Sequence, residues 1–369
     1  MLRTTDILMK LLRVALKTDN DLSLDTQINL NKLIYTSTEQ GVNSIAVDGW
    51  EMLQPNIEPK QIFSTSSEKD LGLLKRDWFN LNLNATQEYN TYIQTVTQLI
   101  QFYESHGIRM VVLKGLGLSR YYPIPSHRPC GDIDIYLLND ETNDTAIRAD
   151  RLIHNELNIK VTKSKIGHHS HFLFNNLNIE NHYELSNTYF GTKDSVYLET
   201  ELKNLINKNQ FQDELGILYP NATFNAVFLM WHMATHFCIN GINLRHLCDW
   251  MMFVHAEHKN VDWMQVVKIW EKSHLKPFAD VINGIIIRKL NANPTFFPPF
   301  KRNRDVEHLV LKDILHSEQR TLSGFANYSW YWKNRWKYHL CSSRSWILHT
   351  IDSVWMHLFH NEDLKEIDI

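Results

Sequence analysis

The 369-residue sequence contains few cysteines and no long apolar run. Its four cysteines, Cys130, Cys238, Cys248 and Cys341, are scattered and form no C-x-x-C pair. This spacing argues against a zinc cage or a disulfide framework and is typical of a protein in a reducing cytoplasm. No stretch approaches the roughly 18 apolar residues of a transmembrane helix, so the sequence predicts no membrane span.

A strong excess of charge and several well-known catalytic motifs are also lacking. The net charge is -3, so the protein as a whole has no electrostatic attraction for nucleic acid or an anionic membrane. The net charge does not rule out a local basic groove. The patterns G-x-x-x-x-G-K-[ST], G-x-G-x-x-G and G-x-S-x-G do not occur. Their absence argues against a P-loop enzyme, a dinucleotide-binding protein and an α/β-hydrolase.

The composition that is present suits a globular protein with a sizeable core. Hydrophobic residues make up 43% of the chain and charged residues 21%. Helical spacing of apolar residues extends over 1–52, and the Pro- and Ser-rich residues 53–70 predict a linker. From Thr86 an apolar stripe predicts a helix that Gly107 is placed to end. The other predicted elements are strands at 110–113, 132–138, 170–174 and 178–185, and helices at 145–158, 224–239 and 242–255.

Two aspartates, Asp132 and Asp134, lie one residue apart in an otherwise apolar predicted strand. Because side chains alternate along a strand, both carboxylates point to one face while Ile133 and Ile135 point into the core. Two neighbouring carboxylates repel each other, and burial would raise the pKa of at least one unless a cation compensates. Carboxylate oxygens are ligands that Mg²⁺ and Mn²⁺ prefer, so the pair predicts a divalent-metal site. A solvated face of an edge strand is the alternative.

The motifs around this pair resemble those of the polymerase-beta-like nucleotidyltransferase superfamily. They are most similar to one branch of it, the uncharacterised nucleotidyltransferases that form its fifth NTP-transferase grouping. The matching motifs are VVLKG (111–115), YYP (121–123), RPCGDIDIYL (128–137), IENH (179–182) and INLRHLCDW (242–250).

The resemblance implies an α+β fold, with a nucleotidyltransferase-like mixed sheet core flanked by helical regions at both ends. We expect three parts: an N-terminal helical region with a linker (1–85), a nucleotidyltransferase-like catalytic core (86–217) and a C-terminal helical domain (218–369).

By the same resemblance, Asp132 and Asp134 bind two metal ions, Mg²⁺ or Mn²⁺. The superfamily usually has a third carboxylate on a neighbouring strand, and Glu180 matches the acidic position before the histidine of IENH. Glu184 is the alternative, because it shares a face with Glu180 if the segment is extended. His182 is expected to orient a carboxylate or to contact the nucleotide, and a purely structural histidine is the other interpretation.

Three residues are candidates for holding the triphosphate. Gly115 has no Cβ, so the backbone could approach phosphate oxygens closely. Lys114 could supply a point charge or point away, and Arg128 is either a second phosphate ligand or a surface arginine. The usual turn of the superfamily is glycine followed by serine, whereas here Lys114 precedes Gly115 and the nearest serine is Ser119.

The implied activity is that of a cytoplasmic transferase. It would move a nucleoside monophosphate from an NTP such as ATP to an acceptor hydroxyl and release pyrophosphate. A small-molecule acceptor fits the nearly balanced charge, whereas an RNA acceptor would need a basic groove. The alternatives are a toxin-like enzyme that modifies RNA or protein, and a non-catalytic nucleotide-binding or scaffold protein that retains the fold.

Two groups of histidines are candidates for a metal site. In GHHSHF only His169 and His171 share a strand face, so ligation that includes His168 would need a bend, and solvated or substrate-adjacent histidines are the preferred interpretation. His232 and His236 are spaced i, i+4 on a predicted helix, but the glutamate that a metalloprotease needs after the first histidine is absent. We therefore expect the second pair to pack in the core or against a nucleotide.

A later pair of opposite charges lies on the predicted helix within INLRHLCDW. Arg245 and Asp249 are spaced i, i+4, which predicts an intrahelical ion pair. The family likeness favours a helix that faces the cleft.

Overall fold

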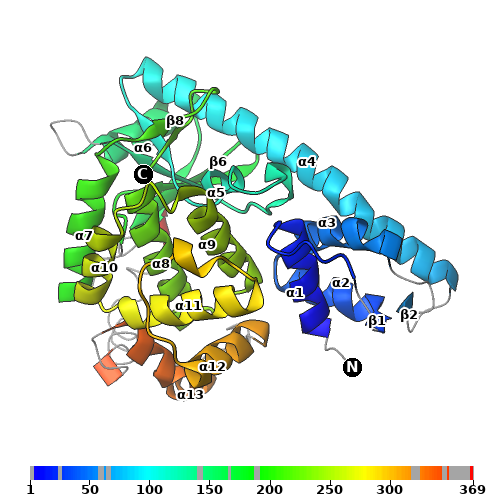
Figure 1. Cartoon of the computed structure of the whole chain (residues 1–369). Coiled ribbons are helices and arrows are strands. Elements are labelled where there is room, and N and C mark those ends of the chain that lie inside the picture. The colour runs from blue at the N-terminus through cyan, green and yellow to red at the C-terminus, as the bar shows by residue number, and fades with distance from the viewer. Residues whose placement is uncertain are drawn as a thin grey trace.

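The structure is a computed structural model that describes residues 4–23, 27–56, 62–63, 68–138, 144–164, 168–186, 192–316, 325–342, 347–348 and 366–368. Within these residues the fold is α+β, as the sequence predicts, with one large mixed sheet and helices on either side of it (Figure 1). None of the described helices combines the length and the apolar character that crossing a membrane requires.

Eight of the described strands form the large sheet, in the order β10, β5, β6, β7, β4, β3, β9 and β8. Two neighbouring pairs, β4 with β7 and β3 with β9, are parallel, and the remaining pairs are antiparallel. Their bounds are β3 (Met110–Val112), β4 (Ile133–Leu137), β5 (Val161–Ser164), β6 (His169–Phe174), β7 (Leu177–His182), β8 (Phe211–Gln212), β9 (Leu218–Tyr219) and β10 (Glu366–Asp368). The four predicted strands are confirmed as β3, β4, β6 and β7.

The described helices account for most of the remaining chain, and a short parallel pair, β1 (Ile28–Asn29) and β2 (Ile62–Phe63), lies among the first of them. The helices are α1 (Thr4–Ala15), α2 (Leu30–Glu39), α3 (Asn43–Leu53), α4 (Glu68–Ser105), α5 (Leu116–Ser119), α6 (Thr145–Leu157), α7 (Lys193–Ile206), α8 (Ala222–Ile239), α9 (Leu244–Glu257), α10 (Trp263–Lys272), α11 (Lys276–Lys289), α12 (Arg304–Leu315) and α13 (Phe325–Cys341), with 3-10 turns η1 (Gln54–Asn56), η3 (Pro125–His127) and η4 (Pro294–Phe296).

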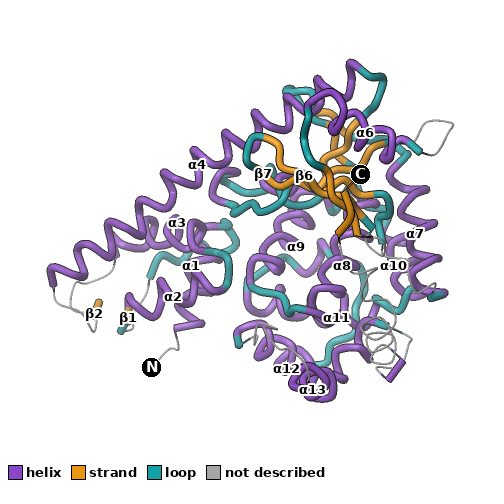
Figure 2. The backbone as a smooth tube through the Cα atoms, turned by 180° about the vertical axis from the view of Figure 1, so that it is seen from behind, coloured by secondary structure: helices purple, strands orange, loops and turns teal. Residues whose placement is uncertain are grey.

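The alternation along β4 gives the sheet two different faces. Ile133 and Ile135 are fully buried in one core together with Val96 and Tyr103 of α4 and with residues of α6. Tyr136 points the other way and belongs to the core that α8 and α9 build. The strands therefore lie between α6 and the end of α4 on one side and α8 and α9 on the other (Figure 2). Gly107, with φ +69°, follows the end of α4 as predicted.

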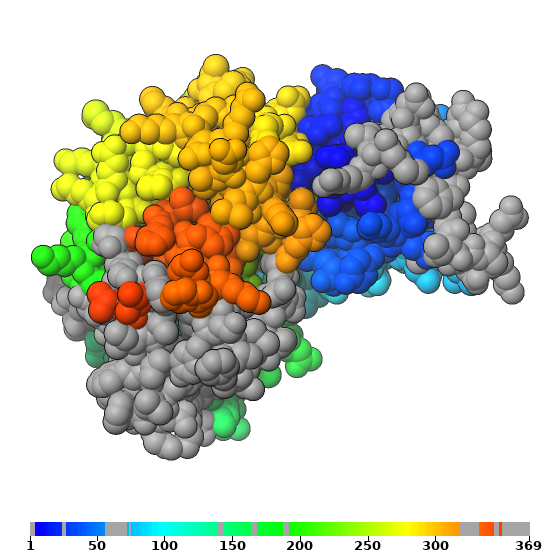
Figure 3. Space-filling view, turned by 90° about the horizontal axis from the view of Figure 1, so that it is seen from below, coloured from blue at the N-terminus to red at the C-terminus, as the bar shows by residue number. Residues whose placement is uncertain are grey.

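The N-terminal helices pack against the C-terminal ones. Arg13 donates to the main-chain oxygen of Lys289, and Gln40 donates to that of Ile314. Figure 3 shows this contact from below, with the blue N-terminal region beside the orange α12. The expected boundary at 85/86 falls inside α4, which is one continuous helix of 38 residues. The division into three parts stays a prediction.

Candidate active site

Two of the predicted carboxylates lie side by side in the sheet. β4 and β7 pair in parallel, and their register sets Asp134 directly beside Glu180. Partners in such a ladder point to the same face, which here is the face opposite the buried isoleucines of β4. Because β7 ends at His182, Glu184 lies beyond the strand. The geometry therefore favours Glu180 over Glu184 as the third carboxylate.

Asp134 is 3% exposed and has two cationic or polar partners. Lys114 Nζ lies 2.5 Å from Asp134 Oδ1, and His182 Nε2 lies 3.0 Å from the same oxygen. Lys114 thus points at the carboxylate and not away from the cleft. The contact of His182 with Asp134 is the one expected of a histidine that orients a carboxylate, and the role of His182 stays a prediction.

The two carboxylates have opposite shifts in pKa. Burial alone would raise the pKa of Asp134, but the Lys114 ammonium and the His182 hydrogen bond bring it well below its usual range. Burial, together with the negative charge of Asp134, raises the pKa of Glu180 to about 7. Near neutral pH Asp134 is therefore ionised, whereas Glu180 exchanges between its two forms.

Asp132 lies one residue before β4 begins and is exposed. Asn178 Nδ2 donates to Asp132 Oδ1 at 3.0 Å, and Asn178 precedes Glu180 by two residues on β7, so the three side chains share a face. Gly115 has a φ of +66°, and a Cβ there would lie 3.4 Å from the main-chain oxygen of Asp132 and 3.8 Å from Asp134 Oδ2. The predicted glycine turn therefore adjoins both aspartates.

These residues fit a divalent cation. One oxygen each of Asp134 and Glu180 and one nitrogen of His182 lie within 4.8 Å of one another. Small side-chain shifts would bring all three to the roughly 2.0–2.2 Å bond lengths of a bound dication. Asp132 stands outside this trio within the described chain, and its exposed carboxylate lies at the open end of the same face.

Arg128 is directed at α9. Its Nε and Nη2 donate to the two carboxylate oxygens of Asp249 at 2.9 and 2.8 Å. The residue is buried, with 5% of its surface exposed. The hydroxyl of Tyr122 also donates to Asp249 Oδ1, at 2.6 Å. In place of the expected intrahelical pair with Arg245, Asp249 therefore anchors the segment that leads into Asp132. The predicted phosphate contact of Arg128 stays a prediction.

Histidines of α8 and α9 face the carboxylates from the other side. Burial, and then the Lys114 cation, lowers the pKa of His232 well below its usual range and that of His236 to about 4. Burial and the nearby Arg245 lower the pKa of His246 to about 3. These imidazoles are neutral at physiological pH, so the histidines of α8 and α9 add no positive charge near the site.

Two site residues that the sequence did not select are His168 and His169. His168 lies at a bend just before β6, and the β6–β7 register sets His169 opposite His182. Asn175 and Asn176 fix this register, because both have positive φ, of 52° and 62°, in the two-residue turn. The asparagine turn was the available signal: counting back from it on both strands pairs the two histidines.

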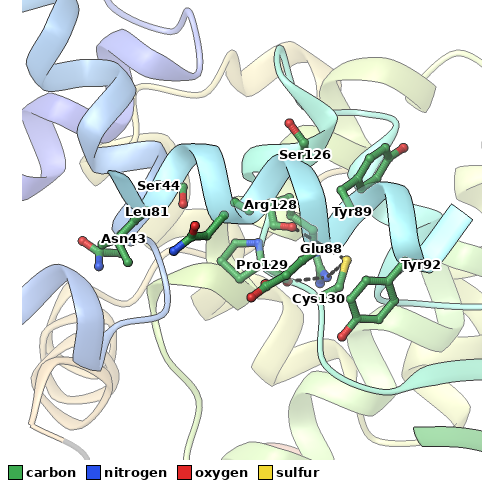
Figure 4. A pocket seen from close by; sticks show the side chains of 12 residues that line it. Asn43, Ser44, Leu81, Glu88, Tyr89, Tyr92, Ser126, Arg128, Pro129 and Cys130 are labelled. Atoms are coloured by element: carbon green, nitrogen blue, oxygen red, sulfur yellow. Dashed lines mark hydrogen bonds between the residues drawn. The ribbon is translucent and has the colours of Figure 1, made fainter. Parts of the chain in front are cut away.

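A hollow of about 200 Å³ with a mixed polar and apolar lining lies between α4 and the segment that leads to β4 (Figure 4). Helix α4 forms one wall and the segment before Asp132 forms another. Tyr92, in this lining, donates from its hydroxyl to the main-chain oxygen of Gly131 at 2.7 Å, which ties the hollow to the start of β4. The lining residues are Asn43, Ser44, Leu81, Asn84, Ala85, Glu88, Tyr89, Tyr92, Ser126, Arg128, Pro129 and Cys130.

Comparison with known proteins gives one match. Residues 69–283 match the family described as uncharacterised nucleotidyltransferase, which is more than half of the chain and includes β4, β7, α8 and α9. Neither the curated proteins nor the solved structures contain a match. The chain therefore belongs to the uncharacterised nucleotidyltransferase family.

Proposed function

We propose that the protein is a metal-dependent nucleotidyltransferase that moves a nucleoside monophosphate from an NTP to an acceptor hydroxyl and releases pyrophosphate. The observation that carries the proposal is the register of β4 and β7, because it sets Asp134 beside Glu180 with Asp132 and Gly115 adjoining. Asp132, Asp134 and Glu180 would hold Mg²⁺ or Mn²⁺. When bound, these ions would activate the acceptor hydroxyl and neutralise the triphosphate.

The contribution of the chain itself is positioning and electrostatics. His182 holds the Asp134 carboxylate in place through the 3.0 Å hydrogen bond. The backbone at Gly115 is open to phosphate oxygens, and Lys114 is near enough to shift from Asp134 to a phosphate. The neutral histidines of α8 add no positive charge beside Asp134 that would compete with a metal ion for its carboxylate.

The acceptor is proposed to be a small molecule. The hollow beside Gly131 is small and has a mixed polar and apolar lining, with the carboxylate of Glu88 and the rings of Tyr89 and Tyr92. Groups of this kind bind hydroxyl- or amine-bearing compounds by hydrogen bonds and ring contacts. The hydroxyl of Tyr92 donates to the main-chain oxygen of Gly131, the residue before Asp132, and this contact supports an acceptor in the hollow.

Labelled transfer from each NTP tests the proposal. The purified chain would be incubated with Mg²⁺ or Mn²⁺, each α-³²P NTP and a cell extract divided into small-molecule, RNA and protein fractions. We expect metal-dependent label in the small-molecule fraction. It should be lost in Asp134→Asn and Glu180→Gln and kept in the matched variant Glu184→Gln.

The outcomes separate the alternatives. Label in RNA or protein would overturn the small-molecule acceptor but retain the transferase. Loss of transfer in Glu184→Gln but not in Glu180→Gln would reverse the assignment of the third carboxylate. The absence of both label transfer and metal-dependent NTP binding would refute the proposed activity.

A further inference from the structure

A cluster of three imidazoles borders the acidic face, and of these only His182 has a part in the proposed transfer, through its hydrogen bond to Asp134. His168, His169 and His182 come from the start of β6 and the end of β7, which are antiparallel neighbours. Their ring centroids are 4.7 Å apart for His168 and His169, and 5.4 Å apart for each of the other two pairs. One nitrogen from each ring lies within 4.8 Å of the others. The three rings therefore form a compact triangle.

Two ring nitrogens of this triangle are buried and lack a hydrogen-bond partner among the described residues. They are Nδ1 of His169 and Nδ1 of His182. His182 is 3% exposed, so water does not readily compensate for the missing partner. A buried polar atom without a partner costs about 1–3 kcal/mol, so each of these nitrogens would gain from binding a ligand.

The hydrogen bond to Asp134 leaves one ring nitrogen of His182 available for a metal. An ionised carboxylate only accepts, so Nε2 is the nitrogen that donates to Asp134, and Nδ1 is the nitrogen left without a described partner. A carboxylate that accepts from the far nitrogen of a metal-bound histidine is a common supporting arrangement, because it fixes the ring and strengthens the ligand. The carboxylate of Asp134 is such a partner for His182, at 3.0 Å from its Nε2.

We propose that His168, His169 and His182 form a binding site for a borderline transition-metal dication of the Zn²⁺ class, distinct from the carboxylate site beside it. Three imidazoles and a water molecule make a tetrahedral set that suits Zn²⁺, whereas Mg²⁺ prefers oxygen ligands. Tetrahedral bonds of about 2.0–2.1 Å require nitrogens roughly 3.4 Å apart. The rings must therefore close by no more than about an ångström and a half.

The site reuses a residue of the carboxylate site without depending on nucleotidyl transfer. His182 would bind the transition metal through Nδ1 while Nε2 continues to hold Asp134. A metal in the imidazole triangle would thereby fix the orientation of a carboxylate proposed to bind Mg²⁺. Binding to the triangle is measurable on its own, whether or not the transfer reaction occurs.

Visible absorption of Co²⁺, a spectroscopic substitute for Zn²⁺, tests the site. Chelator-treated full-length protein would be titrated with Co²⁺ and then with competing Zn²⁺. We expect the visible bands of tetrahedral Co²⁺ at one equivalent, displaced by Zn²⁺. His168→Gln and His169→Gln should weaken binding at least about 100-fold, because loss of an outer partner alone costs about 10- to 100-fold.

Two control variants keep the result specific. His171→Gln changes the next histidine of β6, and Asp132→Asn disables the proposed carboxylate site; both should retain the Co²⁺ bands. Zn²⁺ should also raise the unfolding temperature of the wild type and of His171→Gln but not of His169→Gln. If His169→Gln does not fold, His168→Gln carries the test. Absence of the bands, or bands that survive both glutamine variants of the triangle, would overturn the proposal.

Discussion

Lys114 neutralises a carboxylate that is almost completely buried. Its Nζ lies 2.5 Å from Asp134 Oδ1, and the side chain is 18% exposed. Lys114→Met should destabilise the metal-free protein by roughly 3 kcal/mol, because it leaves the Asp134 charge without its cation. Excess Mg²⁺ should then stabilise the variant more than the wild type, since the metal supplies the missing positive charge. Thermal unfolding with and without Mg²⁺ measures both effects.

An ion pair with an exposed lysine provides the control for this variant. Lys203 is 40% exposed and pairs with Glu199, four residues earlier in α7, whose buried carboxylate also accepts hydrogen bonds from the main-chain nitrogens of Leu185 and Ser186. Lys203→Met should cost less than about 1 kcal/mol and leave the response to Mg²⁺ unchanged. An equal response to Mg²⁺ in Lys114→Met and in the wild type would show that Lys114 and the metal do not compete for Asp134.

Gly115 combines a strained backbone with a close approach to the acidic face. Its φ of +66° and ψ of -111° lie outside the regions that side chains with a Cβ tolerate. Gly115→Ala should cost about 1–3 kcal/mol and also weaken NTP binding, because the new methyl group faces the Asp132 carbonyl. Gly107 has a similar φ of +69° with open space around it. Gly107→Ala should therefore lower the stability but leave NTP binding unchanged. Urea unfolding measures the stability of both variants, and titration with NTP measures their binding.

At the scale of elements, α1 and α3 cross so closely that only glycine fits between them. A Cβ on Gly49 would collide with the main-chain carbonyl of Leu11. Gly49→Ala should separate the two helices and cost about 1–3 kcal/mol or more, because backbone cannot move aside as a flexible side chain can. Urea unfolding measures this loss.

Gly72 in α4 is the matched control for the helix crossing. It is exposed, and nothing lies within 4 Å of the position that a Cβ would take. Gly72→Ala should therefore stabilise the protein by about 0.5–1 kcal/mol, through helix propensity alone. A loss of stability as large as that of Gly49→Ala would contradict the steric explanation.

Local patterning predicted the elements that bury one apolar face. The stripe of α4 from Tyr89 to Tyr103 and the apolar runs of β3 and β4 are examples, because each packs against a single core. The sequence predicts a linker over 53–70 and a helix only from Thr86, so it does not predict the first half of α4. It carries exposed leucines such as Leu73 and Leu83, and Trp78, at 1% exposure, buries against the N-terminal helices. The two halves of α4 pack against different cores, so no single apolar stripe extends along the whole helix.

The site was predicted in its residue types but not in its connections. The D-h-D spacing and the IENH motif identified Asp134 and Glu180, and the parallel register that joins them is a property of the sheet. The pair between Arg128 and Asp249 spans 121 residues, so no local spacing indicates it. The nearer cation Arg245 was therefore the natural partner to expect from the sequence, although its Nε is buried without a partner in the described part of the chain.

At the scale of the whole molecule, buried polar contacts join the sheet to the helices that follow it. Gln40 connects the N-terminal region to the rest: its side chain donates to Ile314 and accepts from the main-chain nitrogen of Leu244 at 3.0 Å. Arg128 and Asp249 make the corresponding link between the segment before β4 and α9. Because such pairs are buried, the stability of the whole fold depends on their ionisation.

The ion pair of Asp249 with Arg128 predicts how the stability of the fold changes with pH. Burial would raise the pKa of Asp249, but the Arg128 guanidinium outweighs it and lowers the pKa below the ordinary value of 3.8. A carboxyl group whose pKa is lower in the folded state stabilises the fold at pH values above 3.8. This contribution disappears as the pH falls below 3.8 and through the folded-state pKa.

Asp249→Asn should therefore have two effects on the free energy of unfolding. Near neutral pH it should cost about 3–5 kcal/mol, because Arg128 stays buried without a counter-charge. Below pH 3.8 the variant should lose stability less steeply than the wild type, because asparagine has no proton to gain. Urea unfolding at a series of pH values measures both. The exposed Asp305→Asn should keep the wild-type slope, and an unchanged slope in Asp249→Asn would mean that other carboxylates set the acid limit of the fold.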